Sequence, residues 1–263
     1  MYKWRTTALT LTLSIGIISG NGSPAAALGA PMGRDYFEPR GEIVWEVPTE
    51  DKVVALTFDD GPDPKQTPVI LDLLGQYQAK ATFFVVGNRA AQYPELLKEV
   101  FQKGHEIGNH TYNHTYFNAS NSSQLFDKEV TRAEELIYNA TGKHSVLFRP
   151  PGGFYNKSIV TSSHSKGYQL VLWSWHQDTR DWARPGVNRI VSRVLGNLRS
   201  GDIILMHDRV EGSSQTALAL KAILPEIQKR GYRCVTVSEL LKHQKHAQPV
   251  KDVQHNGQKK TGL

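Results

Sequence analysis

Residues 53–62 of this 263-residue chain read VVALTFDDGP, and the predicted fold follows from them. The apolar start predicts a strand that is buried on both faces, as in a parallel sheet. The strand ends in two adjacent carboxylates, Asp59 and Asp60, after which Gly61 and Pro62 turn the chain. Such carboxylates repel each other unless a cation or a shared proton relieves them, although Asp-Gly is also common in ordinary polar turns.

From residue 51 onward the chain repeats a pattern: a short apolar run, a polar loop, an amphipathic stretch and often a glycine suited to a left-handed helix cap. Strands are predicted at residues 53–56, 81–86, 105–107, 146–148, 168–175, 203–206 and 233–237, with helices at 67–78, 122–140, 187–198 and 217–228. Alternating strands and helices predict an α/β fold, a distorted (β/α) barrel of about seven parallel strands in one domain. The alternative is an open doubly wound sheet, which is disfavoured because no dinucleotide-type glycine loop follows the first strand.

The N-terminal 30 residues have the layout of a secretory signal peptide. Lys3 and Arg5 precede an apolar run at residues 8–18, and small residues follow it. An uncleaved anchor is the alternative, but the run is short for a span of about 20 residues. We therefore expect export to the cell surface, the cell wall or the medium, with an irregular lead-in at residues 31–50 and the folded domain at 51–241.

The positive charge of the chain belongs to its ends. Of the net charge of +6, residues 1–30 contribute +2 and residues 242–263 contribute +4, which leaves residues 31–241 neutral. The body therefore carries no excess of positive charge for nucleic acid. The polar tail, residues 242–263, is predicted to be disordered and is able to contact an anionic surface such as a cell wall. The single cysteine, Cys234, is read as a small buried side chain.

Five predicted strands end in groups that suit a chemical site. These groups are Asp59–Asp60, His110–His114, Arg149–Gly153, Asp178–Trp182 and His207–Asp208. In a β/α barrel such strand ends converge on the active site. His110 and His114 are four residues apart, so a helical turn would place both imidazoles on one face, although two unrelated surface histidines are the commoner meaning of this spacing. Two histidines and one carboxylate would form a zinc site with an open fourth position.

Five segments of the chain resemble the ordered motifs of a known family. TFDDGP (57–62), HTYNH (110–114), RPPGG (149–153), DTRDW (178–182) and LMH (205–207) are similar to the motifs of the polysaccharide deacetylase family, the NodB-homology group of carbohydrate esterase family four. The resemblance covers roughly residues 51–241. It implies a distorted (β/α) barrel that removes N-acetyl groups from chitin-like glycans or peptidoglycan, or O-acetyl groups from xylan.

The resemblance also implies a role for each matching residue. It makes Asp60, His110 and His114 the metal ligands, with Zn²⁺ expected and other divalent transition metals such as Co²⁺ as alternatives. It makes Asp59 the general base, held by Arg149, and His207 the general acid, oriented by Asp181. The backbone N–H of Gly152 would bind the oxyanion, and Trp182 and Leu205 would line a pocket for the acetyl methyl group.

Two positions depart from the family pattern or leave a choice open. Many members carry a tyrosine where Gly152 stands, which changes the wall of the groove. Asp178 competes with Asp181 as the partner of His207. The other histidines, His105, His144, His164, His176 and those of the tail, are read as structural or solvent-exposed.

The expected function is de-N-acetylation of a polysaccharide that contains N-acetylglucosamine. Peptidoglycan is favoured, and chitin or chitooligosaccharide comes next. An O-acetyl esterase that acts on xylan is one alternative. A catalytically inactive glycan-binding protein of the cell envelope is the other, and it is disfavoured because the base, the metal ligands and the acid are all present.

Overall fold

The computed structural model describes residues 32–117, 123–212 and 214–244. The predicted signal peptide and all but the first three residues of the predicted tail lie outside these ranges, so they stay predictions. Within these ranges no helix is both long and apolar enough to span a membrane.

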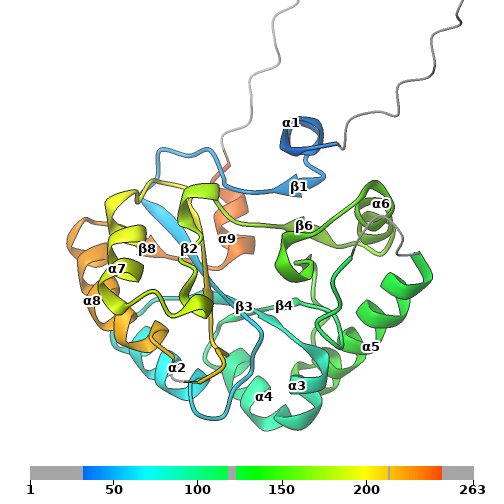
Figure 1. The fold of residues 1–263 in the computed structure, drawn as a ribbon, viewed down its shortest axis with the longest axis horizontal. Helices are drawn as coiled ribbons and strands as arrows, with labels where there is room; N and C mark the ends of the chain where they lie inside the picture. Colours follow the sequence, from blue (N-terminus) through cyan, green and yellow to red (C-terminus); the bar gives the residue numbers. More distant parts are fainter. Residues whose placement is uncertain (1–31, 118–122, 213, 245–263) are drawn as a thin grey trace, which may run out of the picture. The chain divides into compact units, whose positions relative to one another are not determined.

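A curled sheet of parallel strands forms the centre of the fold (Figure 1), in the order β1-β6-β5-β4-β3-β2-β7, with β8 beside β2. The strands are β1 (Ile43–Val44), β2 (Val53–Asp59), β3 (Ala81–Val85), β4 (Glu106–Asn109), β5 (Leu147–Phe148), β6 (Gln169–Val171), β7 (Ile203–His207) and β8 (Arg233–Cys234). All their pairings are parallel. The predicted distorted (β/α) barrel is confirmed, and each of the seven predicted strands overlaps an observed one.

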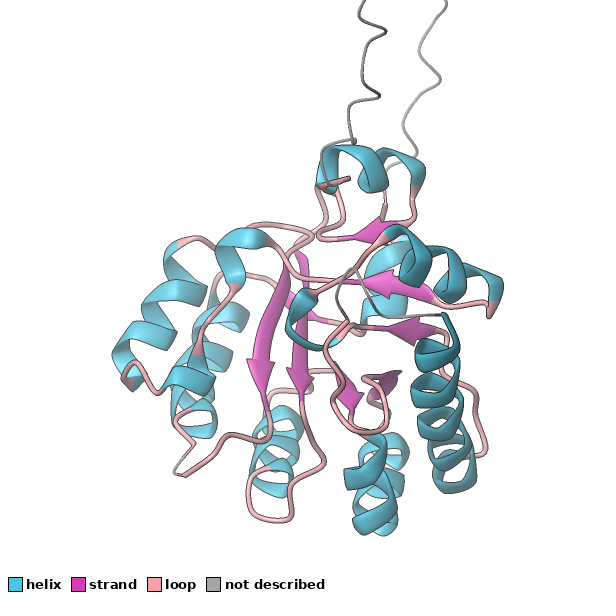
Figure 2. Cartoon of the chain, turned by 45° about the vertical axis from the view of Figure 1, so that its right-hand side comes forward, coloured by secondary structure: helices cyan, strands magenta, loops and turns pink. Residues whose placement is uncertain are grey.

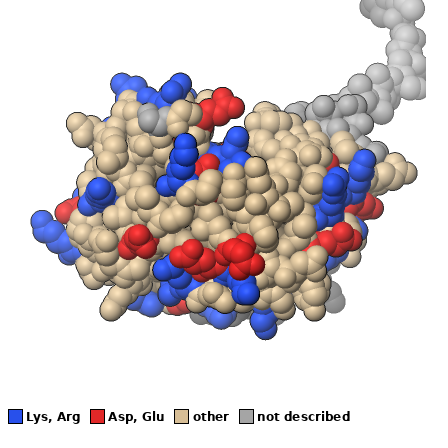
Figure 3. Space-filling view, turned by 90° about the horizontal axis from the view of Figure 1, so that it is seen from below, with Lys and Arg blue, Asp and Glu red and all other residues tan. Residues whose placement is uncertain are grey.

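Helices cover the outside of the curled sheet (Figure 2). They are α1 (Arg34–Phe37), α2 (Thr67–Gln76), α3 (Gly87–Gln92), α4 (Pro94–Gln102), α5 (Ser123–Thr141), α6 (Lys157–Ser165), α7 (Val187–Gly196), α8 (Thr216–Lys229) and α9 (Val237–Lys242). The four predicted helices correspond to α2, α5, α7 and α8. Basic and acidic side chains are interspersed on the face shown in Figure 3, as expected for a body without net charge.

Strand β2 is buried along its whole length, and its two faces have different neighbours. Val54, Leu56 and Phe58 pack in the large cluster that includes buried side chains of α2, α7 and α8. Val53 and Ala55 belong to another cluster, together with Phe84 of β3, Val171 of β6 and Ile203 of β7. Because side chains alternate along a strand, Thr57 and Asp59 lie on this second face, inside the curl.

Strands β1 and β7 form the two edges of the curl, and isolated bridges connect the segment after β1 and the loop after β6 to β7 and the residue before it. Glu46 bridges Asp202 in antiparallel fashion, and Asp178 bridges Leu205 in parallel fashion. We call this region, residues 46–47, 174–179 and 201–205, the closure seam. The N–H of Val47 donates to the carbonyl of Gly201 at 2.9 Å. Gly201 has a φ of 83°, and a Cβ there would lie 1.7 Å from the carbonyl oxygen of Val47, so only glycine fits.

Two segments differ from their predicted form. The expected irregular lead-in contains β1, whose two residues pair with Leu170 and Val171 of β6. The strand predicted at 168–175 is shorter, because β6 ends at Val171 and the chain then enters a loop with the 3-10 helix η3 (Trp175–Gln177). The loop remains beside β7, since the N–H of Ser174 donates to the carbonyl of Ile203 at 3.0 Å.

Candidate active site

The two carboxylates at the end of β2 both line one cavity. Asp59 is the last residue of β2 and is 3% exposed. Strand alternation would send the next side chain to the opposite face of the sheet. Asp60 has a φ of 77°, in the left-handed region, which breaks the alternation. The turn therefore brings Asp59 and Asp60 to the same site.

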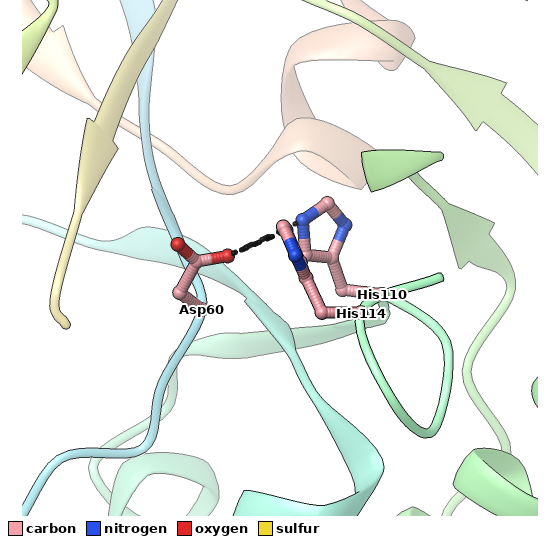
Figure 4. A group of neighbouring side chains, drawn as sticks. All are labelled: Asp60, His110 and His114. Carbon is pink, nitrogen blue, oxygen red and sulfur yellow. Dashed lines mark ion pairs between the residues drawn. The ribbon is translucent and has the colours of Figure 1, made fainter. Parts of the chain in front are cut away.

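Asp60, His110 and His114 form a group that can hold a metal ion (Figure 4). Asp60 Oδ1 lies 3.1 Å from Nε2 of His114 and 3.6 Å from Nε2 of His110. This oxygen is buried and has no hydrogen-bond partner among the described residues. A ligand atom from each residue lies within 4.8 Å of the other two. The donor set fits a divalent transition metal with an open position toward the cavity.

The protonation states of this group also favour a metal. The Nδ1 of His110 lies 2.6 Å from the carbonyl oxygen of Arg149, which only accepts, so Nδ1 carries the hydrogen and Nε2 has a free lone pair. Burial lowers the pKa of His110, despite the nearby Asp59 and Asp60. Burial opposes ionisation of Asp60, but His114 and His110 outweigh it and lower the pKa of Asp60 to about 2. The set therefore contains an ionised carboxylate and a neutral, correctly oriented imidazole.

The predicted helical turn at His110–His114 is wrong. These residues form a loop after β4, in which Thr111 has a φ of 67° and His114 a φ of 57°. The side chain of Asn109 accepts from the N–H of Thr111 at 3.0 Å, and Thr111 Oγ1 accepts from the N–H of Thr115 at 3.0 Å. This loop still brings the two imidazoles together, with ring centroids 5.1 Å apart.

Arg149 is fully buried behind Asp59 and holds it in one orientation. Its Nη1 donates to Asp59 Oδ1 at 2.7 Å and to Thr57 Oγ1 at 2.8 Å. Its Nε and Nη2 donate to the carbonyls of Val171 at 3.2 Å and Leu172 at 2.8 Å. Asp59 Oδ2 then faces the metal group, 3.7 Å from Nε2 of His110. The charge-assisted bond of Arg149 thus leaves one oxygen of Asp59 free to accept a proton.

His207 lies across from Asp59 and has Asp181 as its hydrogen-bond partner. Asp59 ends β2 and His207 ends β7, and the pairing of these two strands places the two residues in register. Asp181 Oδ1 lies 2.7 Å from Nδ1 of His207, so the imidazole donates to the carboxylate and directs Nε2 away from it. Asp178 instead contacts Arg180 at 3.8 Å, and no contact with His207 is found in the described part of the chain. Burial lowers the pKa of His207, but Asp181, together with Asp60 and Asp59, outweighs burial and raises this pKa to about 9.

The cavity in front of these groups has a volume of about 610 Å³. It is lined by Asp59, Asp60, His110, His114, Tyr116, Gly152, Phe154, Trp173, Asp178, Trp182, Leu205, His207, Arg209, Val210 and Glu211. The three predicted substrate-contacting residues, Gly152, Trp182 and Leu205, are therefore all on its wall. Arg149 and Asp181 stand behind the wall, each against a lining residue.

The aromatic side chains near Gly152 were not predicted as site residues. Gly152 has a φ of 63°, and a Cβ there would lie 2.7 Å from the ring of Tyr116 and 2.8 Å from that of Phe154. The two rings thus take the space that a side chain at position 152 would need. Phe154 directly follows the RPPGG motif, and this position was the one sequence signal that could have placed it at the site. No sequence signal placed Tyr116 there.

Asp208 had no predicted role, and the structure buries it beside the site. Its Oδ2 accepts from Thr67 Oγ1 at 2.6 Å, and a Cβ on Gly61 would lie 2.1 Å from the same oxygen. Burial raises the pKa of Asp208 to about 7. Asp208 therefore packs against the turn that follows Asp60.

Known proteins with similar sequences are carbohydrate deacetylases. Residues 46–171 match the family model described as polysaccharide deacetylase. The chain is 53% identical to a peptidoglycan-N-acetylglucosamine deacetylase of Bacillus cereus over 211 residues, which cover 80% of this chain and 98% of that protein. It is 37% identical to a chitooligosaccharide deacetylase of Bradyrhizobium sp., a match that covers 71% of this chain and 90% of that protein.

Solved structures agree with these matches. A peptidoglycan N-acetylglucosamine deacetylase in complex with an N-oxidanyl-benzamide has a TM-score of 0.74 at 32% identity, covering 80% of this chain and 98% of that chain. A family 4 acetyl xylan esterase of Clostridium thermocellum, in complex with cobalt, has a TM-score of 0.66 at 32% identity, covering 73% of this chain and 91% of that chain. Fold and site thus define a hydrolase of acetylated polysaccharides. The chain belongs to the polysaccharide deacetylase family, as its five motifs predicted.

Proposed function

We propose that this protein removes N-acetyl groups from N-acetylglucosamine residues of peptidoglycan. One observation carries the proposed reaction: Asp59 and His207 stand in register on neighbouring strands, beside the group Asp60, His110 and His114. The name of the 53% identical relative supports peptidoglycan as the substrate.

The metal would be held by Asp60, His110 and His114. The orphaned oxygen of Asp60 and the free lone pair of His110 favour such an ion. Zn²⁺ is our first choice, and the cobalt-bound esterase of similar fold supports Co²⁺ as a working substitute. When bound, this ion lowers the pKa of a water molecule and polarises the acetamide carbonyl.

The residues of the chain then move the protons. Asp59, oriented by Arg149, accepts the proton of the attacking water through its free oxygen. The Gly152 N–H stabilises the negative charge that develops on the carbonyl oxygen. His207 donates the proton at Nε2 to the nitrogen as the C–N bond breaks, so the products are acetate and the sugar amine. Trp182 and Leu205 enclose the acetyl methyl group.

Chitooligosaccharide and acetylated xylan are the alternative substrates, because relatives named for them share the fold or the sequence. Amides and esters differ in how much their leaving groups need a proton. An amine leaves only after protonation, so a His207→Ala change should reduce amide cleavage more than ester cleavage. Equal losses would contradict the role of His207 as the acid.

The decisive experiment is acetate release by the full chain after chelation and again after Zn²⁺ is added back. Peptidoglycan, N-acetylated chitooligosaccharide and acetylated xylan are compared, with His110→Ala as the inactive variant. We expect zinc-restored release, greatest from peptidoglycan and absent in His110→Ala. Preference for another polymer would correct the substrate alone. If zinc is bound but no acetate is released from any polymer, the proposed enzymatic activity is refuted and an inactive glycan-binding protein is favoured.

We also propose that the chain is exported through residues 1–30 and that its basic tail contacts the cell wall. The charge of +4 on residues 242–263 supports the second point. Fractionation of cells that express the full chain, with and without residues 245–263, tests both. Recovery of the full chain in the cytosol would contradict export, and equal wall binding of both forms would contradict the role of the tail.

A further inference from the structure

A second group of potential metal ligands lies at the closure seam. Glu46, His176 and Asp202 each offer one ligand atom, and these atoms lie within 4.8 Å of one another. Asp202 directly precedes β7, whereas His207 ends it. At about 3.3 Å per residue, the two ends are roughly 16 Å apart. None of the three residues lines the active-site cavity, so this group is separate from it.

His176 and one carboxylate oxygen of Glu46 have no hydrogen-bond partners in the described part of the chain. His176 is 8% exposed, and in the described ranges neither of its ring nitrogens makes a hydrogen bond. Its Nε2 lies 2.9 Å from Asp202 Oδ1, but the pair lacks the alignment of a hydrogen bond. Glu46 Oε2 is likewise buried and unpartnered. Burying such groups is costly unless something satisfies them, and a bound cation would satisfy Glu46 Oε2 and one ring nitrogen of His176.

Hydrogen bonds from the protein hold the other oxygen of each carboxylate, Oε1 of Glu46 and Oδ2 of Asp202. Glu46 Oε1 accepts from Nη2 of Arg34 at 2.8 Å. Asp202 Oδ2 accepts from Nε2 of Gln177 at 2.9 Å and from the N–H of Arg199 at 2.8 Å. Glu46 thus uses one oxygen for the protein and leaves the other for the group, and Asp202 directs Oδ1 toward His176. Carboxylates that ligate metals are oriented in this way.

We propose that Glu46, His176 and Asp202 bind a divalent transition metal ion at the closure seam. One imidazole and two carboxylates suit Zn²⁺ or Mn²⁺ better than Ca²⁺ or Mg²⁺, which prefer oxygen ligands alone. The ion would join three segments that are far apart in the sequence: the one after β1, the loop after β6 and the start of β7. It would therefore strengthen the closure of the barrel rather than take part in the reaction.

A rival explanation is a protonated His176 that bridges the two carboxylates without a metal. In that arrangement the ring N–H groups would point at carboxylate oxygens. Neither ring nitrogen has a partner in such geometry in the described part of the chain. The two explanations differ in whether the seam takes up an ion, which can be measured directly.

The test counts zinc ions per chain. The full-length protein is stripped with chelator, incubated with Zn²⁺, passed through a desalting column and analysed by mass spectrometry for metal content. His110→Ala/His114→Ala removes two ligands of the active-site group, and His176→Gln is then added to it. We expect the double variant to keep one more zinc ion than the triple variant. Histidines of the tail contribute equally to both and cancel in the difference.

Thermal unfolding supplies a second readout. Zn²⁺ should raise the Tm of His110→Ala/His114→Ala, and this rise should vanish when His176→Gln is added, because a ligand stabilises only the fold that binds it. His144→Gln is the matched control, since His144 also pairs with a carboxylate, Glu134 at 3.0 Å, but is exposed. It should leave the rise unchanged.

Glu46→Gln keeps the proposal testable if His176→Gln does not fold. The Glu46 side chain is 32% exposed, so the fold tolerates this isosteric change better. We expect at least tenfold weaker zinc binding at the seam. Equal zinc content of the double and triple variants, or of the double variant with and without Glu46→Gln, would overturn the proposal in favour of the protonated bridge.

Discussion

At the scale of single residues, Asp181 controls the protonation of His207. Its Oδ1 accepts from the imidazole, and its Oδ2 accepts from the backbone N–H of His207 at 2.8 Å and from Thr216 Oγ1 at 2.7 Å. Asp181 is fully buried, so its charge is poorly screened. Burial lowers the pKa of His207, but this charge, together with those of Asp60 and Asp59, raises it to about 9.

Asp181→Asn should therefore reduce general-acid catalysis by His207 and change the pH profile of acetate release. Without the charge of Asp181, only Asp60 and Asp59 would oppose the effect of burial, so the pKa of His207 should fall and less of the imidazole should carry a proton at pH 8. We expect acetate release at pH 8 to fall by about a hundredfold. The alkaline limb of the profile should also move to lower pH. A rate profile from pH 5 to 10 measures both effects.

Asp178→Asn is the control for this change. It removes a carboxylate from the same motif that contacts Arg180 and not His207. The alkaline limb should stay in place. An unchanged limb in Asp181→Asn would instead show that His207 does not depend on Asp181 for its proton.

At the scale of elements, Arg149 connects three strands. It follows β5 and donates to side chains of β2 and to the carbonyls of Val171 and Leu172 at the end of β6. Arg149→Met would break all these bonds and leave the carboxylate of Asp59 buried without its cation. We expect the free energy of unfolding to fall by about 3–5 kcal/mol, measured by urea denaturation.

Arg233→Met is the control, because it tests whether replacing an exposed arginine also lowers the free energy of unfolding. The side chain of Arg233 is 64% exposed, and its contact with Glu239 is 3.9 Å long. Its loss should change the free energy of unfolding by less than about 0.5 kcal/mol. Similar losses in the two variants would contradict the role of Arg149 as a link between strands.

The sequence predicted those features of the structure that produce a local pattern of residue types. The apolar run at 53–56 predicted β2, because burial on both faces leaves a continuous apolar pattern. The loop at His110–His114 was mispredicted as a helical turn, since the left-handed conformations of Thr111 and His114 leave no trace in residue type. The orphaned atoms of His176 also left none, because they depend on Glu46 and Asp202, which are distant in sequence.

At the scale of the whole molecule, the closure seam holds the curl together. Here the sequence was least informative, since β1 has two residues and the bridges Glu46–Asp202 and Asp178–Leu205 have no periodic pattern. Gly201 permits a close backbone approach across the seam, to the carbonyl of Val47. The integrity of the barrel thus depends on a few backbone contacts between distant segments.

Gly201→Ala should open this seam. Its Cβ would lie 1.7 Å from the carbonyl oxygen of Val47, a backbone atom that moves only if the seam moves. We expect a loss of at least about 3 kcal/mol in the free energy of unfolding, measured in urea. Gly142→Ala is the matched control, because Gly142 also has a left-handed φ, of 69°, but nothing lies within 4 Å of its Cβ position.

The control should lose only about 1 kcal/mol, the cost of a left-handed alanine. The difference between the two variants then isolates the clash from the backbone strain. If Gly201→Ala lost no more than Gly142→Ala, the close contact with Val47 would not matter for stability.

The register of Asp59 with His207 has a consequence for how such enzymes diversify. Backbone hydrogen bonds between β2 and β7 set the spacing of the two groups, and no loop is needed to maintain it. Tyr116, Phe154 and Trp182, in contrast, line the cavity from segments outside the strands. Each of these wall residues is close in sequence to a reaction group: Tyr116 follows His114, Phe154 follows Gly152 and Trp182 follows Asp181. Polymer preference should therefore diversify by substitution of single wall residues, whereas exchange of whole loops would also replace groups of the reaction.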